Sequence, residues 1–108
     1  MNEPSNTPVP FPAKLRATYK LSKLASNEEK KLVLETAKEV MEEKASEGWG
    51  SICFEVLSKY VALTLRDSVR TTAFKDAFAY ATAILIAEGV PKERRPATGD
   101  YFYWDDSQ

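Results

Sequence analysis

The sequence predicts an all-α fold, namely a small helical bundle of three long helices plus a short N-terminal element. The main observation is that apolar residues recur at intervals of three and four along three segments, which is the period of an amphipathic helix. The second is that the chain has 108 residues, 44% of them apolar, which supports one globular domain. We expect an extended Pro-rich leader over 1–12, a helical domain over 13–91 and an aromatic, acidic C-terminal tail over 92–108.

The first 24 residues are unusually rich in proline and in basic residues. Prolines at 4, 8, 10 and 12 keep the leader extended. It is either flexible or an arm laid across the domain through Val9 and Phe11. Residues 13–24 alternate apolar and basic side chains and fit a short helix about as well as a strand. Residues 1–24 have a local charge balance of +3, because one acid, Glu3, faces Lys14, Arg16, Lys20 and Lys23.

The helix expected over 27–47 has clear start and stop signals. Ser26 and Glu29 have the Ser-x-x-Glu spacing of a capping box, and Gly48 ends the pattern. One apolar stripe runs between them, formed by Val33, Ala37, Val40, Met41 and Ala45. Lysines alternate with the glutamates of the outer face, which predicts a solvated, ion-paired surface rather than a metal site at Glu35, Glu39 and Glu42.

Two further segments complete the expected bundle. Residues 51–66 fit a helix capped by Ser51, although their β-branched residues leave a buried strand as a competitor. Residues 69–88 form the last long helix, which ends at Gly89 and Pro91. This helix has no charge between Asp76 and Glu88, and small residues line 73–87. It is therefore either the spine of the core or the contact face of a homodimer.

The composition excludes many functions. The chain has no histidine and a single cysteine, Cys53, which rules out His-based triads, intramolecular disulfides and Cys-cluster zinc sites. We expect Cys53 to be a small buried residue, although it lies close to a helix start, where a thiolate is favoured. With no Gly-rich loop or nucleophile elbow, we expect neither catalytic residues nor a cofactor. The N-terminus lacks a signal peptide and no apolar run can span a bilayer, so we expect a cytoplasmic protein with no membrane partner.

The C-terminal aromatic residues are the main candidate for function. Four consecutive aromatics are flanked by acids, in the order Asp100, Tyr101, Phe102, Tyr103, Trp104, Asp105 and Asp106. As a free segment they would dock on another protein, with the rings as anchors and the carboxylates steering the tail to a basic groove. The alternative is that the rings fold back on the domain's own core. We therefore expect a non-catalytic protein-binding module, a small adaptor, accessory or inhibitor protein.

Nucleic-acid binding is the alternative function. The segments over 51–66 and 69–88 would form a helix-turn-helix-like pair, with exposed residues at the start of the second helix. Its contacts would come from Arg66, Arg70, Lys75, Arg94 and Arg95. Asp67 and Asp76 lie beside these cations, and the net charge is −1, both of which argue against this function.

Overall fold

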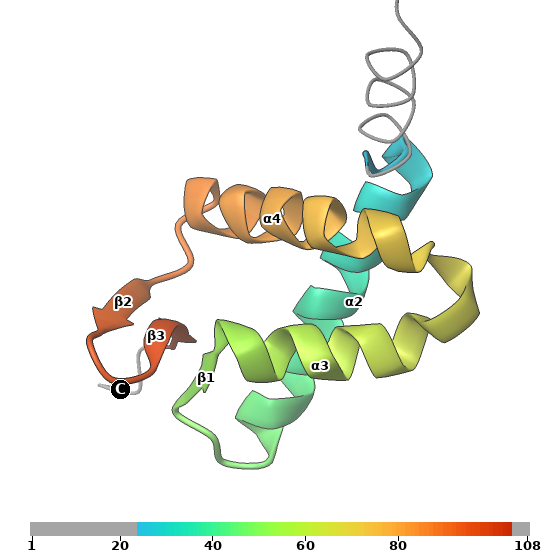
Figure 1. Cartoon of the computed structure of the whole chain (residues 1–108). Helices are drawn as coiled ribbons and strands as arrows, with labels where there is room; N and C mark the ends of the chain where they lie inside the picture. The colour runs from blue at the N-terminus through green and yellow to red at the C-terminus, as the bar shows by residue number, and fades with distance from the viewer. Residues whose placement is uncertain (1–23, 105–108) are drawn as a thin grey trace, which may run out of the picture.

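The computed structural model describes residues 24–104; the leader over 1–12 and the acids Asp105 and Asp106 lie outside the described residues. Three helices and three strands follow in the order α2 (Asn27–Ser46), β1 (Ser51–Cys53), α3 (Phe54–Leu65), α4 (Thr71–Ala87), β2 (Lys92–Arg95) and β3 (Gly99–Tyr103), with a 3-10 turn, η1 (Arg66–Ser68), between α3 and α4. In Figure 1, α3 and α4 run in roughly opposite directions across α2. The hairpin formed by β2 and β3 lies at the end of the domain where α3 begins and α4 ends.

The prediction of an all-α fold is wrong, because the described residues contain a three-stranded antiparallel sheet in the order β1-β3-β2. The residues expected to form a tail make a hairpin, in which Arg94 pairs with Asp100 and Lys92 with Phe102. The third strand, β1, joins from 50 residues away, where Ile52 pairs with Phe102. A hydrophobic period within one segment cannot reveal such a pairing, since it depends on two segments distant in sequence.

The prediction of the first helix is confirmed within one residue. The Ser26 hydroxyl accepts a hydrogen bond from the Glu29 backbone at 3.1 Å, and the Glu29 carboxylate accepts one from the Ser26 backbone at 2.8 Å, so the capping box is complete. Both α2 and α4 end in a Schellman motif. The left-handed conformation that this motif needs is supplied by Gly48 and Gly89, both at φ +98.

The segment 51–66 contains both of its expected alternatives. Ser51–Cys53 is a strand, and Phe54–Leu65 is a helix. The N-cap of α3 is Cys53 rather than Ser51, and its thiol sulfur accepts a hydrogen bond from the Val56 backbone at 3.4 Å. The last expected helix begins slightly later than predicted, at Thr71.

The core lies where α2 crosses α3 and α4 and where the sheet closes one end of the helices. The fully buried side chains include Val33 of α2, Leu57 of α3 and Phe102 of β3. The small residues of α4 divide between two faces: Ala73, Ala77 and Ala81 are buried, whereas Ala79, Ala83 and Ala87 are exposed. Small side chains let α4 approach α2 closely along the buried row. Among residues 24–104, no helix combines the length and apolar character needed to cross a membrane.

Candidate functional site

The structure brings the aromatic residues of the predicted tail into the domain itself. Phe102 is fully buried, and its ring centroid lies 4.5 Å from that of Phe54. Tyr101 is half-buried and lies under the Arg95 guanidinium at 4.0 Å, whereas Tyr103 is exposed. The acid at the start of the segment, Asp100, bonds to Arg94 within its own hairpin at 3.2 Å. These residues therefore form the central strand of the sheet.

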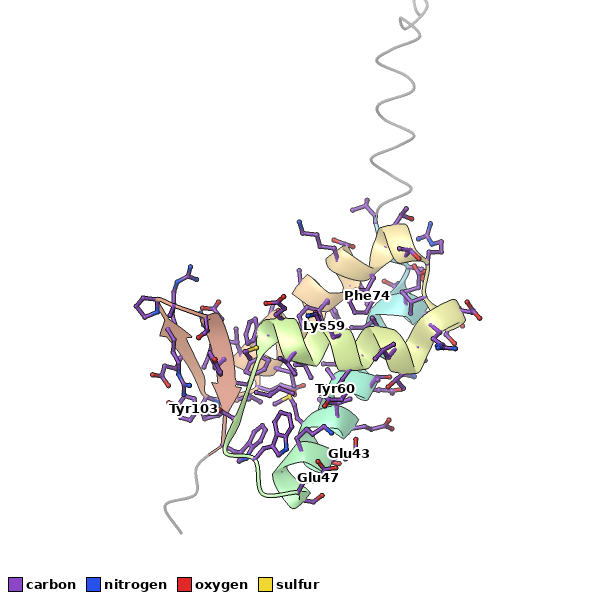
Figure 2. All side chains as sticks on the ribbon, turned by 60° about the horizontal axis from the view of Figure 1, so that its bottom comes forward. Glu43, Glu47, Lys59, Tyr60, Phe74 and Tyr103 are labelled. Atoms are coloured by element: carbon purple, nitrogen blue, oxygen red, sulfur yellow. The ribbon has the colours of Figure 1, made fainter. Side chains whose placement is uncertain are left out.

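The last aromatic residue, Trp104, closes a second cluster at the C-terminal end of α2. Its indole N–H donates to the carbonyl oxygen of Trp49. The buried ammonium of Lys44 lies 4.3 Å from the Tyr60 ring centroid and 5.3 Å from that of Trp49. Burial alone lowers the pKa of Lys44, but Glu47, Tyr60 and Glu43 outweigh it and raise the pKa above the usual value. In Figure 2, Tyr60, Glu43 and Glu47 lie toward this end of α2. The Lys44 side chain therefore belongs to this cluster and contacts both the Tyr60 and the Trp49 ring.

The cations proposed for nucleic-acid binding have different environments. Arg94 and Arg95 lie on β2 and pair with Asp100 and Glu93 within the hairpin. Arg70 is bound to Glu29, from 41 residues earlier. Arg66 and Lys75 are exposed, and within residues 24–104 neither side chain makes a hydrogen bond or an ion pair. Only these last two therefore combine exposure with an unneutralised charge.

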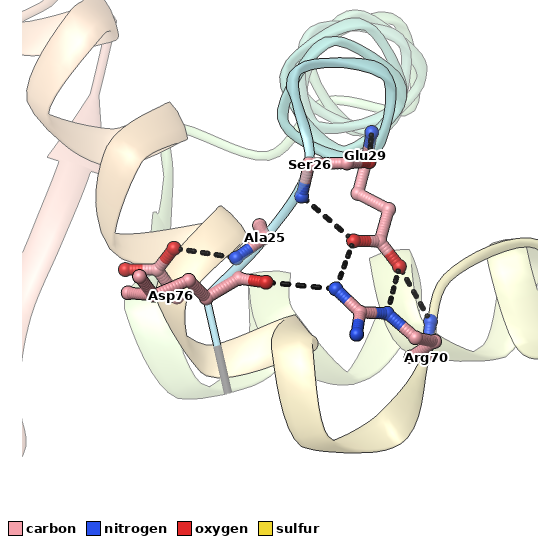
Figure 3. Close-up of polar contacts among 6 residues, drawn as sticks. Ala25, Ser26, Glu29, Arg70 and Asp76 are labelled. Atoms are coloured by element: carbon pink, nitrogen blue, oxygen red, sulfur yellow. Dashed lines mark hydrogen bonds and ion pairs between the residues drawn. The ribbon is translucent and has the colours of Figure 1, made fainter. Parts of the chain in front are cut away.

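Arg70 and Glu29 form a clasp at the point where the described chain begins (Figure 3). The carboxylate of Glu29 accepts from the Arg70 backbone and Nε at 3.0 Å each and from the guanidinium Nη2 at 2.9 Å. The guanidinium also donates to the Leu24 carbonyl oxygen. The carboxylate of Asp76, within α4, accepts from the Ala25 backbone N–H. The hydrogen bonds from Arg70 and Ser26 lower the pKa of Glu29 from 4.5 to about 2. These contacts attach residues 24–29, which lead into α2, to the N-terminal part of α4.

An apolar groove follows the joint between α3 and α4, and we call it the α3–α4 groove. One part has a volume of about 400 Å³ and is lined by Ala62, Leu65, Arg66, Val69, Thr71, Phe74 and Lys75. The other has a volume of about 280 Å³ and is lined by Phe54, Glu55, Ser58, Phe74, Lys75 and Phe78. Phe74 and Lys75 line both, so the two parts adjoin one another. Figure 2 shows Phe74 between the two helices.

The groove was not predicted from the sequence, because the helix over 69–88 was expected to be covered, either as the spine of the core or as the contact face of a homodimer. Its walls include Phe74 and Phe78. Both rings are only half-buried, and they stack on one another with centroids 5.9 Å apart. Their spacing of four residues predicts a shared face of the helix, but not whether that face is covered. The sequence does show that this helix is apolar around most of its circumference, which is more apolar surface than one neighbouring helix can cover.

No group of three His, Cys, Asp or Glu side chains among residues 24–104 is placed to hold a metal ion. Cys53 is half-buried, and its sulfur serves as the cap of α3.

Comparison with known proteins does not identify the chain. No protein family model matches it, and neither the curated proteins nor the solved structures show a significant match. The proposal for function therefore depends on the residues alone.

Proposed function

We propose that the chain is a non-catalytic protein-binding module and that it binds its partner in the α3–α4 groove. The observation that carries this proposal is a pair of adjoining hollows with three aromatic rings among their lining residues, Phe54, Phe74 and Phe78. Grooves between helices are common sites for the apolar face of a partner helix. The half-buried free thiol of Cys53 agrees with action in the cytoplasm, where thiols stay reduced.

The groove suits a docking site better than the aromatic strand does. A ring that anchors a partner must be free to enter the partner's pocket. Phe102 has no exposed surface, and extracting it would remove a core residue. The groove rings are partly exposed without leaving their helices. A partner would cover apolar surface that water now contacts, which is favourable by roughly 25 cal/mol per Å² of apolar area.

Filling the groove tests this proposal. Ala62 is exposed and lines the groove, so Ala62→Trp places an indole in the larger hollow without disturbing the core. The matched control is Leu63→Trp, one residue further on the same helix at a side chain that is 64% exposed and does not line the groove. We expect a protein captured from nuclease-treated source extract by the natural chain and by Leu63→Trp to be lost with Ala62→Trp. Retention by all three chains would contradict the proposal.

Nucleic-acid binding is the second candidate, favoured by one observation. Arg66 and Lys75 are exposed cations without partners among residues 24–104, and they lie on either side of the joint between two successive helices. Two features weigh against it. The helices of a helix-turn-helix cross at about 90–120°, whereas α3 and α4 run in roughly opposite directions (Figure 1). The outer face of α4 beyond Lys75 presents Ala79, Ala83 and Ile86, which offer no hydrogen bonds to base edges.

A salt titration separates the two candidates. If the chain binds nucleic acid, its affinity for a labelled duplex falls steeply with added salt and weakens further in Lys75→Glu. Arg70 is unsuitable for this test, because its reversal would break the bonds to Glu29. We expect no binding to duplex or single strands at low salt. A steep salt dependence that Lys75→Glu reduces would favour nucleic acid instead.

A further inference from the structure

We propose that the partner of the α3–α4 groove is an acidic amphipathic segment, whose apolar side chains enter the groove and whose carboxylates face Arg66 and Lys75. This inference rests on the proposed function and specifies the chemistry of the partner. It combines two independent features of one site: apolar walls, and two cations that the described chain leaves unneutralised.

The charge at the groove carries the first step. Arg66 and Lys75 both line the larger hollow, which has no acidic lining residue. The smaller hollow has one acid, Glu55, and that carboxylate already pairs with Lys59 at 3.7 Å. Asp67 follows Arg66 in the chain but does not line the groove. Complementary charges around an apolar site orient a partner and raise its rate of association.

The apolar walls carry the second step. Leu65 and Val69 form the floor at one end, and Phe54 and Phe78 form the walls at the other. Phe74 lies between them. An amphipathic helix places bulky side chains at i, i+3 or i+4 and i+7, so successive side chains of its stripe can enter the two adjoining hollows. The occupant must therefore be apolar along one side and acidic along the other.

Other occupants match this chemistry less well. The segment over 13–24 is basic and so has the same sign of charge as Arg66 and Lys75, and the leader over 1–12 has a single carboxylate, Glu3, among four prolines that oppose an amphipathic helix. A second copy presents acidic residues on α2, but the apolar stripe of that helix is buried in its own core. The exposed apolar residues of α2 are Leu32, at 37% exposed, and the small Ala45. Neither offers a helical row of free apolar anchors together with several carboxylates.

A selection from random peptides tests the inference. Displayed peptides of about 16 residues, long enough to form a helix, are selected on the full chain and counter-selected on Ala62→Trp. We expect enriched peptides to carry an apolar residue every three or four positions and a net negative charge. Their affinity is then measured for Leu63→Trp and for the double variant Arg66→Glu, Lys75→Glu. Leu63→Trp should bind like the natural chain, and the double variant about tenfold more weakly in low salt, a difference that high salt reduces.

The outcomes separate the inference from the proposed function. Groove-dependent peptides that are neutral or basic, or that bind the double variant equally well, overturn the acidic partner but leave the protein-binding function in place. Peptides that resemble residues 8–12 would point to the leader as occupant and overturn the inference in the same way. If no enriched peptide distinguishes Ala62→Trp from Leu63→Trp, both the inference and the groove as a docking site fail.

Discussion

At the scale of single residues, Glu29 has the most demanding position in the described structure. It completes the capping box of α2 and also binds Arg70, so one carboxylate joins the first turn of α2 to the first turn of α4. The carboxylate is nearly buried, whereas the Arg70 side chain is half exposed. Solvent around the guanidinium weakens the ion pair, and we therefore attribute about 1–2 kcal/mol of the free energy of unfolding to it.

Replacing this carboxylate by an amide should lower stability in a pH-dependent way. Glu29→Gln keeps a group that can complete the capping box but removes the charge that binds Arg70. The pKa of Glu29 is about 2 in the folded protein against 4.5 normally. The stabilisation is therefore present above about pH 4.5 and is lost as pH falls toward 2. Urea unfolding should show a loss of about 1–2 kcal/mol near pH 7 and a vanishing difference near pH 2.

The control for this prediction is Glu28→Gln, which removes the same charge from the exposed neighbouring position. It should change the free energy of unfolding by less than about 0.5 kcal/mol at either pH. Equal losses for both variants would show that the effect comes from the helix dipole and not from the clasp.

At the scale of elements, β3 shows where inference from sequence succeeds and where it ends. The helix over 27–46 could be predicted because its signals, Ser26, Glu29 and Gly48, all lie within or beside the helix. The strands could not be predicted in this way, because β3 pairs with β1, through Ile52, on one side and with β2 on the other. The aromatic run lies near the C-terminus, where side chains are usually exposed, yet it supplies the buried Phe102. The composition marks this segment as unusual, but its role as the central strand of the sheet depends on its pairing with β1 and β2.

The contribution of β3 to stability can be measured at Phe102. Phe102→Ala removes a fully buried ring that packs on Phe54, so we expect a loss of about 3–5 kcal/mol in urea unfolding. Tyr103→Ala, at the next position on the exposed side of the strand, should cost no more than about 1 kcal/mol. If Phe102→Ala does not fold at all, Phe102→Leu gives a measurable intermediate loss. A Phe102→Ala variant as stable as Tyr103→Ala would contradict the buried position of this ring.

At the scale of the whole molecule, the apolar surface of α4 is divided between a buried face and a face that water can reach. One face of the helix packs on α2 through Ala73, Ala77 and Ala81. Another face, with Phe74 and Phe78, remains at the surface as a wall of the α3–α4 groove. A sequence shows the total apolar surface of a helix but not how its neighbours share it, so the groove could not be located in advance. The candidate docking site therefore lies between α3 and α4 and not on the C-terminal strand.

The positions of the two tryptophans give the molecule a built-in optical reporter. Trp49 and Trp104 are the only tryptophans of the chain, and a hydrogen bond joins them beside Lys44 and Tyr60. Neither lines the α3–α4 groove. Tryptophan fluorescence thus follows the attachment of the end of β3 to the loop after α2, while circular dichroism follows the helices. Coincidence of the two signals during unfolding would show that sheet and helices lose their structure as one cooperative unit.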